Sequence, residues 1–152
     1  MKQKLSYSIK TYDELDKNEL YDLLQLRAAV FVVEQDCPYQ DVDGKDQKAL
    51  HLLGYTGNKL VAYTRLFPIG SYFKNASIGR VVVAEKERKY GYGKELMQQS
   101  IKVIVDRYGK NTIEISAQEY LRKFYNELGF VQSGEGYLED NIPHIRMFKT
   151  DF

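Results

Sequence analysis

The pattern of hydrophobic and polar residues predicts strands and helices along the whole chain. Residues 5–9 alternate between apolar and polar side chains, as a strand with one buried face does. Asp16 starts a capping-box spacing, and apolar residues then recur at helical intervals, so we expect a helix to about Val33. Residues 34–48 are polar and predict a long loop, a kind of segment that often carries function.

The middle of the chain is rich in residues that favour strands. Residues 49–55 and 59–67 have this composition, and Gly57-Asn58 between them predicts a hairpin. Residues 76–84 form a nearly continuous apolar run that is dense in valine. Such a run predicts a strand that is covered on both faces.

The second half alternates helices with strands. Apolar residues from Leu96 to Tyr108 recur at helical spacing, and Gly109 closes that helix. Ser116 and Glu119 have the spacing of a second capping box, which predicts another helix that Gly129 ends. The strands expected in this half are residues 112–115, 130–131 and 142–148.

The order of these elements predicts an α+β fold with a mixed sheet. No linker rich in Pro, Gly or Ser divides the chain, and no internal repeat is visible. Its 152 residues are close to the usual size of one domain. We therefore expect a single domain over residues 1–152.

Composition narrows the classes of partner and location. The 22 basic and 21 acidic residues give a net charge of only +1, which argues against nucleic acid as a partner. One cysteine, Cys37, excludes a framework of internal disulfides. We see no signal peptide and no apolar run near the roughly 20 residues that cross a bilayer. We therefore expect a cytoplasmic protein with no membrane partner.

The stretch after the valine-rich strand has the chemistry of a phosphate site. The strand leads through Arg88-x-x-Gly91-x-Gly93 into a helix. A helix N-terminus offers unpaired N–H groups, and glycines let a phosphate approach them. Arg88 and Lys94 add positive charge at the same place. The alternative is that the two glycines only permit a tight turn; the pattern is neither a P-loop nor a dinucleotide fingerprint.

These residues resemble motif A of the GNAT N-acetyltransferases, which have Gln or Arg, two residues, Gly, one residue, then Gly or Ala. The resemblance implies the GNAT fold, with a mixed, mostly antiparallel sheet of six to seven strands flanked by about four helices. It implies acetyl-CoA, or coenzyme A, as co-substrate, with the pantetheine arm paired to a free strand edge. The cofactor-binding residues implied are Val81, Val82, Val83, Arg88, Lys89, Tyr90, Gly91, Tyr92, Gly93 and Lys94.

A second segment supports the same resemblance. Residues 124–130 are similar to motif B of the family, in which Tyr, three residues, Gly and Phe end a helix. Many members have Asn seven residues before that tyrosine, whereas this chain has Gln118, which we include among the cofactor-binding residues. Residues 26–35, 37–39 and 141–145 resemble the ElaA-type branch, so the likeness covers nearly the whole chain.

The expected reaction sets two proton requirements. An alkylamine has a pKa of about 10 and must lose a proton before it attacks a thioester. The leaving thiolate must be protonated, and the resemblance assigns this general-acid role to Tyr125; the alternative is a structural tyrosine packed beside Phe124. His144 is a candidate base or a hydrogen-bonded structural histidine, and Glu34 could accept a proton or hold a cationic substrate. His51 lies among leucines and is expected to be structural.

Three aspartates crowd the predicted loop. Asp41, Asp43 and Asp46 lack the 12-residue calcium pattern with its terminal Glu, so we expect no metal. A solvated acidic loop is expected; the alternative is a wall that recognises the amine. Arg80 interrupts an apolar strand and needs a carboxylate, which Glu34 or one of these aspartates could supply.

Together these observations predict an acyl-CoA-dependent N-acyltransferase that moves acetyl to a primary amine of a small molecule, peptide or protein. Residues 26–46 also faintly resemble acyl-homoserine-lactone synthases, and a non-catalytic CoA-binding module is the alternative outside enzymes. Nothing near Cys37 favours a thiolate nucleophile, and direct transfer needs none. Exposed edge strands make a homodimer possible.

Overall fold

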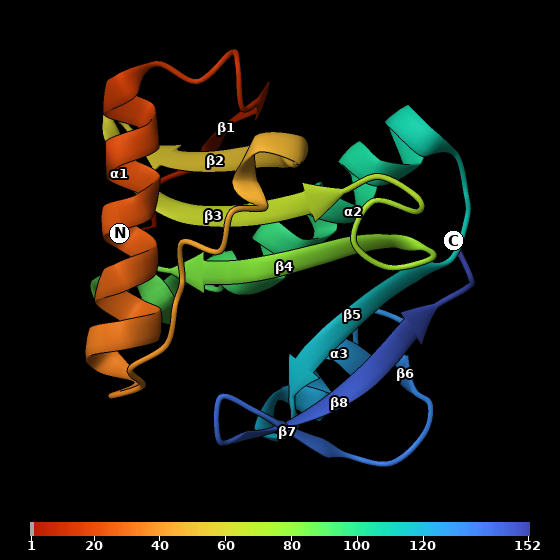
Figure 1. Ribbon diagram of the computed structural model, residues 1–152. Helices are drawn as coiled ribbons and strands as arrows, with labels where there is room; N and C mark the ends of the chain where they lie inside the picture. Colours follow the sequence, from red (N-terminus) through yellow and green to blue (C-terminus); the bar gives the residue numbers. More distant parts are fainter. Residues whose placement is uncertain (1) are drawn as a thin grey trace.

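A single mixed sheet of eight strands forms the centre of the computed structural model, which describes residues 2–152 (Figure 1). The strand order is β1-β2-β3-β4-β5-β8-β6, and β7 pairs with β8 off this path. All pairs are antiparallel except β4 with β5. The strands are β1 (Ser6–Thr11), β2 (Leu50–Thr56), β3 (Lys59–Phe67), β4 (Ala76–Val83), β5 (Ile113–Gln118), β6 (Val131–Gln132), β7 (Tyr137–Glu139) and β8 (Ile142–Lys149).

The expected hairpin and the mixed, mostly antiparallel sheet are both present. The short strand β7 raises the number of strands above the expected six to seven. Three α-helices accompany the sheet: α1 (Lys17–Arg27), α2 (Tyr92–Tyr108) and α3 (Arg122–Asn126). A π-helical segment over Ala28–Glu34 continues α1, and short 3₁₀ turns cover Asp46–Lys48, Glu85–Tyr90 and Glu119–Leu121. No helix among residues 2–152 is long and apolar enough to cross a membrane.

The first helix begins as the sequence predicts. The Asp16 carboxylate accepts a hydrogen bond from the Glu19 N–H at 2.7 Å, and Glu19 accepts one from the Asp16 N–H at 2.9 Å. This reciprocal capping box satisfies two donors that the helix itself leaves unpaired. The predicted helix does run to about Val33, but its last part is π-helical rather than α-helical. Single π-helical turns occur frequently at functional sites.

The second predicted capping box is wrong. Ser116 lies within β5, where its hydroxyl hydrogen-bonds to the hydroxyl of Tyr137 and donates to Glu139 at 3.3 Å. Helix α3 starts only at Arg122 and has no side-chain cap. Because β5 pairs with β8 up to Gln118, the ladder keeps these residues extended where local capping would have begun a helix.

The hydrophobic core lies on both faces of the sheet. Helix α1 covers one face, where Leu23 packs with Leu53 and Tyr63. Helix α2 covers the opposite face, where Leu96 packs with Leu52, Ala62 and other strand residues. Adjacent strand residues point to opposite faces, so Leu52 and Leu53 enter different layers. The sheet is thereby fixed from both sides, as Figure 1 shows for α1 in front and α2 behind.

Strands β4 and β5 separate soon after they meet. They pair only at Ala76 with Ile113 and at Ser77 with Glu114, and then diverge. A β-bulge bends β4 just beyond that point, because the register with β3 shifts between Tyr63 and Arg65. Arg80, inside the bulge, has a positive φ of 50°, which is unusual for a residue with a side chain. The divergence leaves a wedge-shaped gap in the sheet.

Candidate active site

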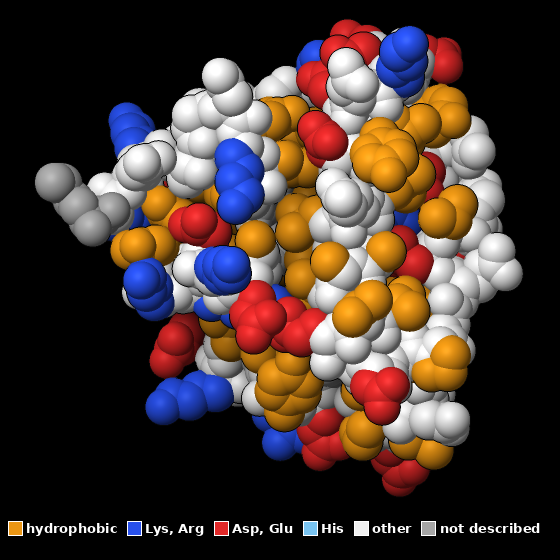
Figure 2. All heavy atoms as spheres, turned by 90° about the vertical axis from the view of Figure 1, so that its left-hand side faces the viewer, with side chains coloured by type: hydrophobic (Ala, Val, Ile, Leu, Met, Phe, Trp, Pro, Cys, Tyr) orange, Lys and Arg blue, Asp and Glu red, His pale blue; other side chains and the backbone are white. Residues whose placement is uncertain are grey.

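The pocket that occupies this gap has a volume of about 610 Å³ and is lined by both diverging strands. Figure 2 shows the face onto which the gap opens, where hydrophobic side chains lie between basic and acidic ones. The π-helical segment after α1, the turn after β4, and α3 also contribute lining residues. Residues predicted for the site that line it are Val81, Val82, Val83, Arg88, Gly91, Gly93, Lys94, Gln118, Tyr125, His144 and Glu34.

Three residues predicted to bind the cofactor do not line the pocket: Lys89, Tyr90 and Tyr92. The side chain of Tyr92 is fully buried in the core and its hydroxyl donates to the Gln3 carbonyl. The Lys89 ammonium lies 5.2 Å from the ring centre of Tyr90. Because its side chain is buried, Tyr92 could contact a cofactor only through its backbone, and the role of all three residues remains a prediction.

The turn between β4 and α2 has the geometry of an anion site. Gly91 has φ 74° and stands directly before the first residue of α2, and no side chain caps that helix. The first N–H groups of α2 are therefore left without side-chain partners at the positive end of the helix dipole. A Cβ at Gly91 would meet nothing within 4 Å, and one at Gly93 would lie 3.7 Å from Phe124. Apart from the positive φ of Gly91, the fold itself leaves room for a side chain at both positions.

One edge of β4 faces the pocket with free backbone groups. The Ala84 N–H donates to the Val61 carbonyl of β3 at 2.8 Å. Because backbone groups alternate along a strand, Val81 and Val83 direct theirs away from β3 and into the gap. The Val83 carbonyl accepts a hydrogen bond from Arg88 Nε at 3.1 Å. Apart from that carbonyl, the edge is free to pair with an extended ligand that carries amide groups.

Tyr125 lies on α3 with its hydroxyl at the pocket. Its ring packs edge-on against Phe124 and Phe130, with ring centres 5.0 and 6.1 Å away. The hydroxyl makes no hydrogen bond within residues 2–152, although Tyr125 is buried and lines the pocket. Burial raises the pKa of Tyr125, so its phenol is protonated at neutral pH. The packing fixes the ring and leaves the O–H free to donate.

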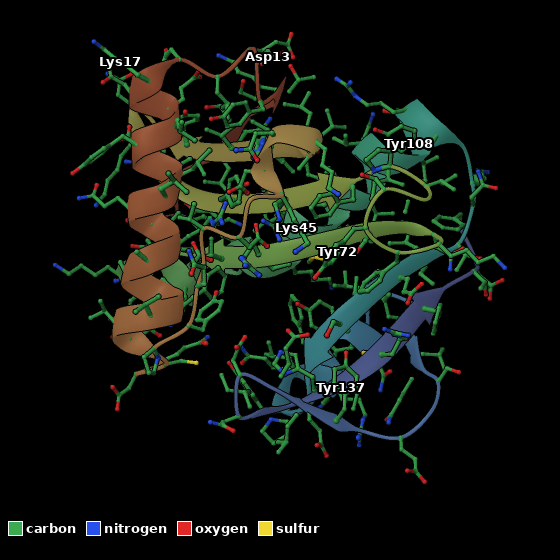
Figure 3. All side chains as sticks on the ribbon, viewed as in Figure 1. Asp13, Lys17, Lys45, Tyr72, Tyr108 and Tyr137 are labelled. Carbon is green, nitrogen blue, oxygen red and sulfur yellow. The ribbon has the colours of Figure 1, made fainter. Side chains whose placement is uncertain are left out.

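His144 lies on β8 and also lines the pocket. Its Nδ1 is 2.7 Å from the Ile142 carbonyl, which can only accept, so Nδ1 carries the proton and Nε2 keeps its lone pair in the neutral ring. Nε2 lies 3.5 Å from a carboxylate oxygen of Glu139. The ring of Tyr137, labelled in Figure 3 beside β7, stacks on His144 with centres 6.1 Å apart. These contacts hold His144 with an acceptor nitrogen at the site.

Glu34 does not pair with Arg80 and instead binds Arg88, in the turn between β4 and α2. Its two carboxylate oxygens accept hydrogen bonds from the Arg88 guanidinium at 2.5 and 2.8 Å. This interaction lowers the pKa of Glu34, so the carboxylate is ionised near neutral pH. The side chain of Gln118 is engaged in a similar way, because its amide donates to the Gln35 side chain at 3.2 Å. The structure thus brings Glu34 and Gln118 to the pocket, with partners that the sequence did not indicate.

The acidic loop is not solvated, which corrects the sequence prediction. Asp41 and Asp46 are 6% and 4% exposed and pair with the fully buried Arg27 at 2.9 and 2.8 Å. Arg65 reaches Asp43 and Asp46 at 2.8 and 3.0 Å. Buried charges need partners of opposite sign, and with Arg80 the three arginines equal the three aspartates in number. We call Arg27, Arg65, Arg80, Asp41, Asp43 and Asp46 the ionic network.

Arg80 completes the ionic network, as its position in an apolar strand suggested. It pairs with Asp41 at 2.8 Å and with Asp43 at 3.3 Å. His51 is structural, as predicted: it is fully buried between the Tyr63 hydroxyl at 2.6 Å and the Asp46 carbonyl at 2.9 Å. No group of acidic, His or Cys residues in the described chain is arranged to hold a metal ion.

Some pocket residues were not predicted from the sequence. Glu139 lines the pocket because β7 and β8 form a hairpin around Asp140 and Asn141, both with positive φ. That pair of residues is a recognised signal for a tight hairpin turn, so the strand before it could have been found. Gln35 also lines the pocket, and no sequence signal marked its contact with Gln118.

Comparisons with known proteins identify the family and the fold. A family model described as an acetyltransferase (GNAT) domain matches residues 13–150. Protein ElaA of Escherichia coli is 42% identical over 138 residues, which are 90% of each chain. An acyl-CoA N-acyltransferase from Pseudomonas aeruginosa is 40% identical over 96% of this chain and 99% of its own, with a TM-score of 0.91. The predicted GNAT fold is therefore confirmed.

A more distant structure bears on the fold alone. The CoA-dependent acyl-homoserine lactone synthase BjaI, described with SAM and isopentyl-CoA, is 18% identical and has a TM-score of 0.75. The match covers 95% of this chain and 82% of that one. At this level of identity the likeness reports a shared architecture and says nothing about the acceptor.

Proposed function

This chain belongs to the GNAT acetyltransferase family, and from this premise we propose that it is an acyl-CoA-dependent N-acyltransferase that moves acetyl from acetyl-CoA directly to a primary amine. One observation carries the proposal. The pocket between β4 and β5 is lined both by the glycine turn before α2, whose first N–H groups have no side-chain cap, and by Tyr125, whose hydroxyl makes no hydrogen bond within residues 2–152. A thioester held between these points would meet a proton donor at its sulfur.

The pocket, which we call the CoA groove, offers a partner for each of two parts of coenzyme A. The free N–H groups at the start of α2, with Arg88 and Lys94, suit a pyrophosphate. The free edge at Val81 and Val83 suits the amides of a pantetheine arm. Arg88 already receives a carboxylate, that of Glu34, which supports the view that an anion is accommodated there.

The two proton transfers can be assigned to the lining. Tyr125 donates its phenolic proton to the sulfur as the carbon–sulfur bond breaks. His144 offers Nε2 as an acceptor for the proton that the amine must lose, and its tautomer is fixed by the Ile142 carbonyl. Glu139 beside His144 would stabilise the imidazolium that forms. Transfer is direct, from thioester to amine, without an acyl-enzyme on Cys37.

The acceptor and its setting complete the proposal. The carboxylates of Glu34 and Glu139 line the same pocket and favour a cationic amine over an anionic one. The acceptor would be a small amine or the amine of a peptide or protein, in the cytoplasm. The proposed reaction involves neither nucleic acid nor a membrane.

A screen of amines with acetyl-CoA, following release of free thiol, tests the function. We expect thiol release that depends on one class of amine, together with an acetylated product detected by mass spectrometry. A protein that binds CoA but releases no thiol with any amine would be a CoA-binding module without catalysis. Release that requires an S-adenosylmethionine-like acceptor would instead favour the acyl-homoserine-lactone alternative.

A further inference from the structure

Two neighbouring residues, Glu34 and Gln35, bind the side chains of Arg88 and Gln118, both of which the sequence predicts to bind the cofactor. Glu34 binds Arg88, at the phosphate turn beyond β4, through two hydrogen bonds. Gln35 accepts the side-chain amide of Gln118, at the end of β5. The contacts span 54 and 83 residues of sequence and meet at one place in the pocket. Glu34 and Gln35 thus connect the two arms of the gap.

The interactions of Arg88 occupy the groups that a CoA molecule would need. Its guanidinium is bound by a carboxylate, in the bidentate manner in which a phosphate would bind it. Its Nε donates to the Val83 carbonyl, which lies on the strand edge expected to pair with pantetheine. Arg88 therefore has its guanidinium occupied by Glu34 and itself occupies the Val83 carbonyl at the strand edge. A CoA molecule that binds Arg88 in the same bidentate manner and pairs with Val83 would take the place of these partners.

The exposure of the pair shows that this exchange is possible. The Arg88 and Glu34 side chains are 41% and 29% exposed, so they can separate without opening the core. An ion pair this exposed stabilises only weakly, because solvent screens it. Glu34 also ends a π-helical segment, whose last carbonyls are bound by the N–H groups of Gln35 and Cys37. The backbone is thus held while the side chain is free to turn.

We propose that Glu34 and Gln35 form a clasp that occupies the CoA groove of the free protein and is displaced when CoA binds. This inference rests on the proposed function, because it takes the groove to be a CoA site. The pyrophosphate takes Arg88 from Glu34, and the pantetheine chain takes the β4 edge and the Gln118 amide. The released Glu34 carboxylate then faces the pocket unpaired and becomes available to a cationic amine. Binding of CoA thereby prepares the site for its second substrate.

The clasp predicts an unusual sign for a simple substitution. Removal of a residue that lines a binding site ordinarily weakens binding, whereas Glu34→Gln and Glu34→Ala should tighten the binding of CoA. We expect a decrease in Kd of about two- to fivefold, the range that an exposed ion pair provides. Isothermal titration of the full chain with CoA measures this directly. The Ala variant removes the acceptor entirely, and circular dichroism confirms that both variants fold.

Two controls separate a clasp from a general effect of charge. Glu85→Gln removes the same charge from an exposed residue whose field also acts on Arg88 but which makes no hydrogen bond to it. The clasp predicts that this variant keeps the Kd of the wild-type protein. In an Arg88→Gln background the clasp is already open, so addition of Glu34→Ala should leave the Kd unchanged.

Each outcome decides between the proposals. Tightening by both Glu34 variants, absent in Glu85→Gln and lost in the Arg88→Gln background, supports the clasp. Unchanged or weaker CoA binding by Glu34→Ala overturns the clasp and leaves the proposed function standing. Equal tightening by Glu85→Gln also overturns it, in favour of general electrostatics. A wild-type protein that binds no CoA overturns both proposals at once.

Discussion

Asp46→Asn tests the finding that the acidic loop is part of the core and not a wall for the substrate. Asp46 Oδ1 accepts hydrogen bonds from Arg27 at 2.8 Å and from Arg65 at 3.0 Å. Asparagine has nearly the same shape and keeps a carbonyl oxygen, so the packing and both hydrogen bonds can remain. What the substitution removes is one negative charge from a group that is 4% exposed.

The size of the effect follows from the balance of charges in the ionic network. Three arginines face three aspartates, and after the substitution one positive charge is left without a counter-charge among groups that solvent hardly reaches. Loss of one partner from a buried pair costs about 3–5 kcal/mol. Because two aspartates remain to share the charge, we expect the lower end, about 3 kcal/mol. For a domain of this size that lowers Tm by roughly 6–12 °C.

Thermal and urea unfolding monitored by circular dichroism provide the measurement, with Asp106→Asn as the matched control. Asp106 pairs with Lys102 at 2.7 Å, but both side chains are at least 60% exposed, so its loss should cost less than about 1 kcal/mol. The KM for the amine should be unchanged in folded Asp46→Asn protein. Wild-type stability together with a raised KM would show that the loop serves the substrate, and the structural assignment would fail.

Three further predictions address the cofactor groove, the acid and the charges. Gly93→Val should weaken CoA binding at least about tenfold with little change in Tm. The fold has space for a Cβ at this position, but the added side chain would keep a phosphate from approaching the N–H groups. Equal affinity would remove the phosphate assignment. Tyr125→Phe should lower kcat by about 10²–10⁴ while Tm and CoA affinity stay the same, because the hydroxyl has no partner to lose; a full rate would end its role as acid. The third prediction concerns Asp43. Burial by itself would raise the pKa of Asp43, but the ion pair with Arg65 outweighs it and holds this pKa at about 2. Its unfolded value is near 3.9, so about 2–3 kcal/mol of stability, present above pH 4, should be lost as the pH falls toward 2, and Asp43→Asn should flatten this dependence in urea titrations.

Features that arise from local rules could be predicted from the sequence. The capping box at Asp16, the hairpin at Gly57-Asn58 and the glycine turn before α2 each depend on a few adjacent residues. The GNAT fold followed from the resemblance rather than from these rules. The second capping box at Ser116 failed for the complementary reason: its spacing was correct, but pairing of β5 with β8 is a long-range interaction that local spacing does not encode.

The ionic network shows where prediction from a single sequence ends. In the sequence, Asp41 and its neighbours have the composition of an ordinary polar loop. Arg27 lies in a helix that also carries exposed charges. Only the odd position of Arg80 signalled that a carboxylate had to be near. Its partners come from a loop that is 37 and 39 residues away along the chain, so their identity depends on the fold already being formed.

The ionic network and the clasp together limit what can move when CoA binds. Arginines from α1, β3 and β4 fix the loop after Gln35 to the bulge in β4, with Arg27 fully buried at the centre. Displacement of that loop would expose several charges without partners, whereas rotation of Glu34 breaks one partly exposed pair. The cheaper motion is therefore the side-chain exchange at Arg88. The ionic network is attached to the bulge in β4 through Arg80, so on the proposed function the response to CoA is confined to Glu34 and Gln35.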